Sequence, residues 1–141
     1  MKRSKKITIG IITFFVVITI IVIGRYSVGL YFKKKFLILD ARSKNRFLGL
    51  EPEPRPGIKS GSIEGSKSLP LNELINTKNN TFLDKGKLKD VFNSKGASNN
   101  ETVMSCGSSV SASSLALAYS IINDDYMAKI YIGSWTEYGK K

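Results

Sequence analysis

The chain has 141 residues, which is enough for one domain of ordinary size. Its formal net charge is +11, but residues 1–35 hold eight of the 22 lysines and arginines and no acidic residue. The other 106 residues carry 14 basic and 11 acidic side chains, a net charge of only +3. Because no surface of interleaved aromatic and basic residues is visible, we exclude nucleic acid as a partner. The single cysteine excludes an internal disulfide.

Residues 7–24 form an uncharged, strongly apolar run between basic residues. A helix of this length reaches most of the ~30 Å apolar core of a bilayer. We therefore predict that residues 1–35 are a basic flank with one transmembrane anchor, and that residues 36–141 are a folded domain. Four Lys or Arg precede the span and six follow it by Lys44, which favours a single-pass protein with a cytoplasmic domain. The alternative is a buried helix of a soluble protein.

From residue 36 the pattern is that of an α/β domain in which strands alternate with helices. An apolar run at 36–39 ends at Asp40 and predicts a buried parallel strand. Alternate prolines make residues 51–57 an extended surface loop. The other elements that we expect are a helical turn at 43–47, a short strand near 68–69, a small helix at 71–75, a polar linker at 76–80, a helix at 87–94, a strand at 102–105, a helix beginning near 111 and ending at 122, and a last strand at 129–132. Parallel strands place functional groups at their C-terminal ends, where Asp40 and Cys106 fall.

The only cysteine, Cys106, follows the 102–105 strand and precedes the long helix, within a loop of small residues. At such a junction, backbone N–H groups and the positive end of a helix dipole stabilise a thiolate and make it nucleophilic. The chain has no histidine, so the loop itself must activate this thiol. The alternative is an unreactive cysteine buried at the end of a strand.

Short motifs spread over residues 36–141 match one known family in order. They are Leu39-Asp40-Ala41-Arg42-Ser43, Arg46-Phe47-x-Gly49, Glu51-Pro52-Glu53-Pro54-Arg55-Pro56-Gly57, Ser60-Gly61, Gly65-Ser66, Leu69-Pro70, Cys106-Gly107-Ser108 and Gly133-Ser134-Trp135-x-Glu137. On these motifs the domain resembles the rhodanese superfamily, and specifically the C-terminal domain of 3-mercaptopyruvate sulfurtransferases. The resemblance implies a parallel sheet flanked by helices. It also implies an enzyme that moves a sulfane sulfur from 3-mercaptopyruvate or thiosulfate to a thiol or cyanide through a cysteine persulfide.

The resemblance assigns a role to each residue of the candidate site. The nucleophile would be Cys106, and the active-site loop would consist of Gly107, Ser108, Ser109, Val110 and Ser111. Arg46 and Arg55 would bind the donor, whose carboxylate and keto oxygen suit forked guanidinium groups. The alternatives are a solvated helix face for Arg46 and pairing with Glu51 or Glu53 for Arg55. No cofactor and no metal site is expected.

The loop composition separates functions within the fold. Phosphatases of this architecture have Arg six positions after the cysteine, where this chain has Ala112, and the absence of basic residues from the loop favours a mercaptopyruvate-type donor. Ser109 stands where the family has glycine, and a left-handed φ there should cost roughly 1 kcal/mol. We interpret Arg42 as a structural partner of the first strand's end and Trp135 as packing. Family enzymes have two rhodanese-like domains, so the alternative function is a catalytically impaired, membrane-tethered module that binds a partner or carries sulfur, and a separate rhodanese-like domain is a candidate partner.

Overall fold

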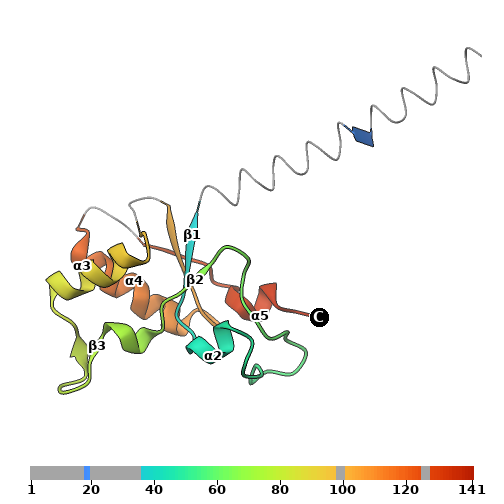
Figure 1. The fold of residues 1–141 in the computed structure, drawn as a ribbon, viewed down its shortest axis with the longest axis horizontal. Helices are drawn as coiled ribbons and strands as arrows, with labels where there is room; N and C mark the ends of the chain where they lie inside the picture. The colour runs from blue at the N-terminus through green and yellow to red at the C-terminus, as the bar shows by residue number, and fades with distance from the viewer. Residues whose placement is uncertain (1–17, 20–35, 98–100, 125–127) are drawn as a thin grey trace, which may run out of the picture. The chain divides into compact units, whose positions relative to one another are not determined.

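The structure is a computed structural model and describes residues 18–19, 36–97, 101–124 and 128–141. The chain divides into two compact units, Met1–Lys35 and Phe36–Lys141. In the first unit only residues 18–19 are described, and both are helical. The second unit contains the strands and helices that follow (Figure 1).

The membrane localisation predicted from the sequence is wrong. Within the ranges that the structure describes, no helix has both the length and the apolar character needed to cross a membrane. The prediction assumed that the uncharged, apolar run at residues 7–24 forms one continuous helix, as a span of about 30 Å requires. Apart from Ile18 and Thr19, the predicted span lies outside the described residues. The transmembrane anchor and the preference for a cytoplasmic domain are therefore not carried further.

A four-stranded parallel sheet forms the centre of the second unit. Its strands are β1 (Leu37–Asp40), β2 (Lys67–Ser68), β5 (Thr102–Ser105) and β6 (Lys129–Ile130), in the order β2-β1-β5-β6. β1 and β5 pair along their whole length, from Leu37 opposite Thr102 to Asp40 opposite Ser105. This register brings Asp40, at the end of β1, and Cys106, the residue after β5, to the same edge of the sheet. The predicted parallel α/β sheet is confirmed.

Helices flank the sheet, with α3 and α4 on one side of the strands and α5 on the other (Figure 1). The helical elements are α2 (Lys44–Phe47), the 3-10 turn η1 (Leu71–Leu74), α3 (Lys85–Ser94), α4 (Val110–Ile122) and α5 (Ser134–Tyr138). α3 begins two residues earlier than predicted because Asp84 Oδ1 accepts a hydrogen bond from the Lys87 N–H at 3.0 Å and caps the helix. The predicted polar linker at 76–80 proves to be part of an antiparallel hairpin formed by β3 (Ile75–Asn76) and β4 (Thr81–Phe82).

The core lies between the sheet and the helices α3 and α4. Leu39 of β1, Met104 of β5 and Leu115 of α4 are fully buried. Phe92 of α3 meets Tyr119 of α4 edge to face, with ring centroids 4.9 Å apart. Each such side chain contributes roughly 1.5–3 kcal/mol by burial, so the core anchors both β5 and α4. The loop between these two elements, which carries Cys106, is therefore held at both ends.

Candidate active site

Cys106 lies in the wall of a cavity of about 380 Å³ and is only 3% exposed. The cavity is lined by Ala41, Arg42, Ser43, Arg46, Pro54, Arg55, Cys106, Gly107, Ser108, Val110 and Ser111. This set contains the predicted nucleophile, both arginines predicted to bind the donor, and all of the predicted loop residues except Ser109. Residues from three separate stretches of the chain thus meet at the C-terminal edge of the sheet, as the strand pattern predicts.

The loop after Cys106 turns at Ser109, whose φ of +66° lies in the left-handed region. A non-glycine residue adopts this conformation at a cost of roughly 1–2 kcal/mol, so the expected strain is present. α4 begins at the next residue, and its first-turn N–H groups and positive dipole end lie beside the loop. Within the described part of the chain, the N–H groups of Gly107 and Ser108 donate to no protein acceptor. These free donors suit an anion on the Cys106 sulfur.

The start of α5 holds this loop in place, a role that the sequence analysis missed. Ser134 Oγ accepts hydrogen bonds from the N–H groups of Cys106 and Ser109, each at 3.2 Å. Further bonds run from the Trp135 N–H to the Cys106 carbonyl at 3.0 Å, from the Thr136 N–H to the Gly107 carbonyl at 2.9 Å, and from the Thr136 hydroxyl to that same carbonyl. The Gly133-Ser134-Trp135 motif is visible in the sequence, but nothing in it indicates which atoms the Ser134 hydroxyl binds.

Arg46 is fixed by Glu53, one of the two carboxylates that the sequence offers as a partner for Arg55. Arg46 donates through Nε and Nη2 to the two carboxylate oxygens of Glu53, at 3.3 and 2.5 Å. The hydrogen bond to Glu53 raises the pKa of Arg46 above its ordinary value, against the effect of burial. Burial by itself would raise the pKa of Glu53, but the hydrogen bonds from Arg46 and Arg42 and their charges hold it below its ordinary value. Arg46 is therefore neither freely solvated nor a mobile surface charge.

Arg55 reaches across the mouth of the loop instead of pairing with an acid. Its Nη2 donates to Ser108 Oγ at 3.2 Å, and its Nη1 donates to Thr136 Oγ1 at 3.1 Å. Both hydrogen bonds are exposed and neutral on the acceptor side, so an anion entering the cavity can replace them at little cost. The pairing of Arg55 with Glu51 or Glu53 that the sequence left open does not occur in the structure.

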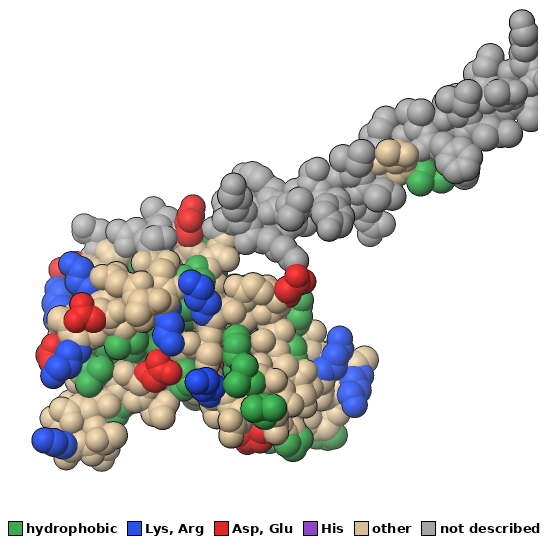
Figure 2. All heavy atoms as spheres, viewed as in Figure 1, with side chains coloured by type: hydrophobic (Ala, Val, Ile, Leu, Met, Phe, Trp, Pro, Cys, Tyr) green, Lys and Arg blue, Asp and Glu red, His purple; other side chains and the backbone are tan. Residues whose placement is uncertain are grey.

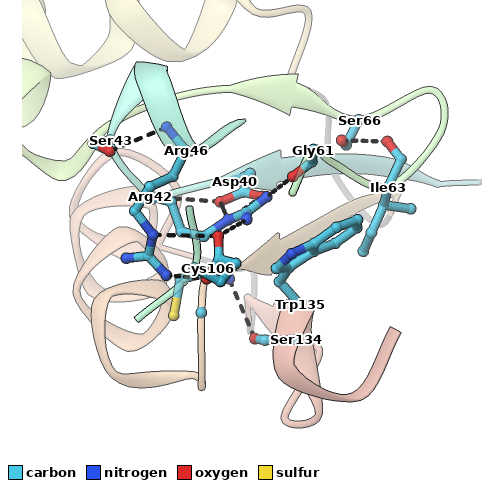
Figure 3. A network of polar contacts seen from close by, with 12 residues as sticks. Asp40, Arg42, Ser43, Arg46, Gly61, Ile63, Ser66, Cys106, Ser134 and Trp135 are labelled. Atoms are coloured by element: carbon cyan, nitrogen blue, oxygen red, sulfur yellow. Dashed lines mark hydrogen bonds and ion pairs between the residues drawn. The ribbon is translucent and has the colours of Figure 1, made fainter. Parts of the chain in front are cut away.

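Arg42 is buried beside the cavity and pairs with the end of β1, which is the structural role that the sequence predicts for it. It donates to Asp40 through its backbone N–H, Nε and Nη2, and to Glu53 through Nη1 at 2.7 Å. Its guanidinium carbon lies 4.8 Å from the centroid of the buried Trp135 ring. Figure 3 shows Asp40, Arg42 and Arg46 drawn together in this network beside Cys106. The network ties the position of Arg46 to the end of β1.

The arrangement offers a cysteine sulfur, free backbone donors and the guanidinium groups of Arg42, Arg46 and Arg55 around one cavity. Among the described residues, no cluster of three or more His, Cys, Asp or Glu side chains is suited to hold a metal ion. The positive charge of the arginines suits an anionic ligand whose reacting atom meets Cys106.

No family model matches the chain. Among curated proteins, it is 43% identical over 101 residues to the mitochondrial thiosulfate/3-mercaptopyruvate sulfurtransferase 1 of Arabidopsis thaliana, covering 71% of this chain and 26% of that protein. It is 35% identical over 109 residues to the 3-mercaptopyruvate sulfurtransferase of Homo sapiens, covering 74% of this chain and 35% of that protein. The chain thus spans only about a quarter to a third of the length of these relatives.

Solved structures give the same result. The Tum1 protein from Saccharomyces cerevisiae superposes with a TM-score of 0.65 at 32% identity, covering 78% of this chain and 38% of that one. A 3-mercaptopyruvate sulfotransferase from Escherichia coli, described as having the "Rhodanese" fold, superposes with a TM-score of 0.59 at 29% identity, covering 78% and 40%. The resemblance inferred from the motifs is thereby confirmed: this chain belongs to the rhodanese superfamily, with a domain like the C-terminal one of 3-mercaptopyruvate sulfurtransferases.

Proposed function

We propose that the domain formed by residues 36–141 is a sulfurtransferase that carries sulfur on Cys106. The observation that supports this most directly is the cavity of about 380 Å³ in which Cys106, Arg46 and Arg55 meet. Curated relatives are named as sulfurtransferases of thiosulfate and 3-mercaptopyruvate, and we propose the same donors for this chain. The acceptor is a thiol or cyanide.

The reaction begins with attack of the Cys106 thiolate on the sulfur of 3-mercaptopyruvate. The new S–S bond forms as the C–S bond of the donor breaks, and the electron pair of that bond leaves on carbon as the enolate of pyruvate. The proton of the donor thiol passes to this carbon, which gives pyruvate and a Cys106 persulfide anion. An acceptor thiolate then attacks the outer sulfur, forms its own persulfide and releases the Cys106 thiolate. With thiosulfate as the donor, the leaving group is sulfite.

The residues around Cys106 support both steps. The free N–H groups of Gly107 and Ser108, with the start of α4, stabilise negative charge on the inner sulfur or on the persulfide. Arg55 exchanges its exposed bonds to neutral hydroxyls for the donor carboxylate. Arg46 keeps its Nη1 group for the donor while Nε and Nη2 stay on Glu53.

The charge around the cavity favours a donor with a single negative charge. Three arginines, Arg42, Arg46 and Arg55, are balanced by the two carboxylates that pair with them, Asp40 and Glu53. The remaining single positive charge and the uncharged loop match the carboxylate of 3-mercaptopyruvate better than the doubly charged thiosulfate. We therefore propose 3-mercaptopyruvate as the preferred donor.

Steady-state turnover of the full chain tests this proposal. Release of pyruvate from 3-mercaptopyruvate and of sulfite from thiosulfate is measured with an added acceptor thiol, and with cyanide. We expect both activities to depend on Cys106, with a higher kcat/KM for 3-mercaptopyruvate. Absence of turnover with every donor and acceptor, in folded protein, would contradict the proposal and favour the binding module. A separate rhodanese-like domain is a further proposed partner, tested by adding such a domain to the same assay.

A further inference from the structure

The hydroxyl of Ser134 has an unusual set of partners. The residue is fully buried, and its Oγ accepts from the N–H groups of Cys106 and Ser109 while it donates to the Tyr131 carbonyl at 2.7 Å. Because the two loop groups are both donors, the hydroxyl proton must point to Tyr131. All hydrogen-bonding capacity of the Ser134 hydroxyl is thus used inside the protein, and none faces the cavity. Its effect on chemistry has to pass through the loop.

The loop needs such support because its turn is strained. Ser109 has a φ of +66°, and Ser134, which holds it, has a φ of +48°. Non-glycine residues keep left-handed conformations only where the surroundings over-determine them. The dashed line between Ser134 and Cys106 in Figure 3 marks one of the two loop contacts, and the bond from the Ser109 N–H is the other. These two bonds connect the strained turn to the start of α5.

We propose that Ser134 is a positioning residue for the nucleophile: by holding the N–H groups of Cys106 and Ser109, it keeps the loop in the conformation in which the free Gly107 and Ser108 N–H groups lie at the cavity beside Cys106. This inference rests on the proposed function for its consequence in catalysis. Loss of the Ser134 hydroxyl leaves the Trp135 and Thr136 bonds to the loop carbonyls in place, so α5 stays attached. Ser109 then relaxes out of the left-handed region, and the N–H groups of Gly107 and Ser108 lose their fixed place beside Cys106.

Alkylation of Cys106 by iodoacetamide as a function of pH measures this effect without any sulfur donor. Cys106 is the only cysteine, so intact mass spectrometry of the full chain reports its modification directly. We expect Ser134→Ala to slow alkylation at neutral pH by roughly tenfold, the factor for one lost hydrogen bond, and to move the half-maximal rate to higher pH. Ser120→Ala is the matched control, since it removes a hydroxyl that only donates to the Ala116 carbonyl within α4. It should leave the profile unchanged.

A rescue variant tests whether Ser134 acts on Cys106 through the turn at Ser109. Adding Ser109→Gly to Ser134→Ala should restore most of the lost rate, because glycine adopts a left-handed φ without strain. A Ser134→Ala profile that coincides with the wild-type profile, or a double variant with no recovery, would overturn the proposal. Should Ser134→Ala fail to fold, Ser134→Gly removes the same hydroxyl while relaxing the φ of +48°, and the same outcomes apply. Because no persulfide is needed, failure of sulfur transfer in the wild type would contradict the proposed function and leave this test intact.

Discussion

The carboxylate of Glu53 joins the two arginines on which the site is built, and its removal should weaken the whole domain. The Glu53 side chain is only 5% exposed and accepts from Arg42 at 2.7 Å and from Arg46 at 2.5 and 3.3 Å. Complete loss of a partner in a buried ion pair costs about 3–5 kcal/mol. Here Arg42 keeps Asp40 and the Gly61 carbonyl, Arg46 is 21% exposed, and glutamine still offers one acceptor oxygen. We therefore expect Glu53→Gln to lower the free energy of unfolding by about 2 kcal/mol at pH 7.

This loss should depend on pH in a defined direction. The pKa of Glu53 in the folded protein lies below its ordinary value of 4.5, so the folded state binds the proton less readily than the unfolded state. The stabilisation by Glu53 is therefore fully present above the ordinary pKa and is lost as the pH falls through the lowered one. The difference between wild type and Glu53→Gln should shrink over the same range, because both then carry an uncharged side chain.

Urea unfolding followed by the fluorescence of Trp135 measures both effects. Trp135 is the only tryptophan, is 4% exposed and has Arg42 over its ring, so its emission reports the state of this network. Glu51→Gln is the matched control, because Glu51 is exposed, accepts a 3.4 Å hydrogen bond from Ser43 and acts on Arg46 through its charge without a hydrogen bond to it. The control should stay within about 0.5 kcal/mol of wild type. A Glu53→Gln variant as stable as the control, or a difference that persists unchanged into acid, would refute the reasoning.

Three further changes test the site and its surroundings. Arg55→Ala should raise the KM for 3-mercaptopyruvate by at least tenfold with a smaller effect on kcat, because Arg55 contributes a charged hydrogen bond to donor binding. An unchanged KM in steady-state kinetics would show that Arg55 does not bind the donor. Gly107→Ala would put a Cβ 3.1 Å from Arg46 Nη2, so it should weaken donor binding while thermal unfolding stays near that of wild type. Gly86→Ala, within α3 and with only the Asp84 side chain nearby at 3.4 Å, should raise the free energy of unfolding by roughly 0.5–1 kcal/mol, and a decrease in a urea titration would count against the helix assignment.

The central elements of the fold follow from the sequence because their signals are local. The apolar run at 36–39 predicts a buried strand and the β-like run at 102–105 a second strand, and the small residues after Cys106 predict the turn into α4. The hairpin of β3 and β4 was missed because its two-residue strands are too short to show a period. α5 was missed because its start has no usual helix signal: it follows a glycine and begins at a serine with positive φ.

The partners of the site residues could not be predicted from the sequence. Arg55 binds Ser108 and Thr136, which lie 53 and 81 residues further along the chain, whereas local spacing suggested a neighbouring glutamate. Glu53 binds Arg42 and Arg46, which its position between two prolines does not indicate. Such contacts depend on how the proline-rich loop folds back toward the residues that follow β1, and only the three-dimensional structure contains that information.

The central claim is that Cys106 accepts sulfur from a donor as a persulfide, and a single-turnover experiment tests it most directly. The full chain is incubated with 3-mercaptopyruvate in the absence of acceptor, and its intact mass is measured before and after addition of a thiol. The account predicts an adduct of one sulfur atom that forms on the wild type, is absent from Cys106→Ser and is discharged by the thiol. A wild-type chain that is folded and gains no sulfur, or a Cys106→Ser chain that gains as much, would contradict it.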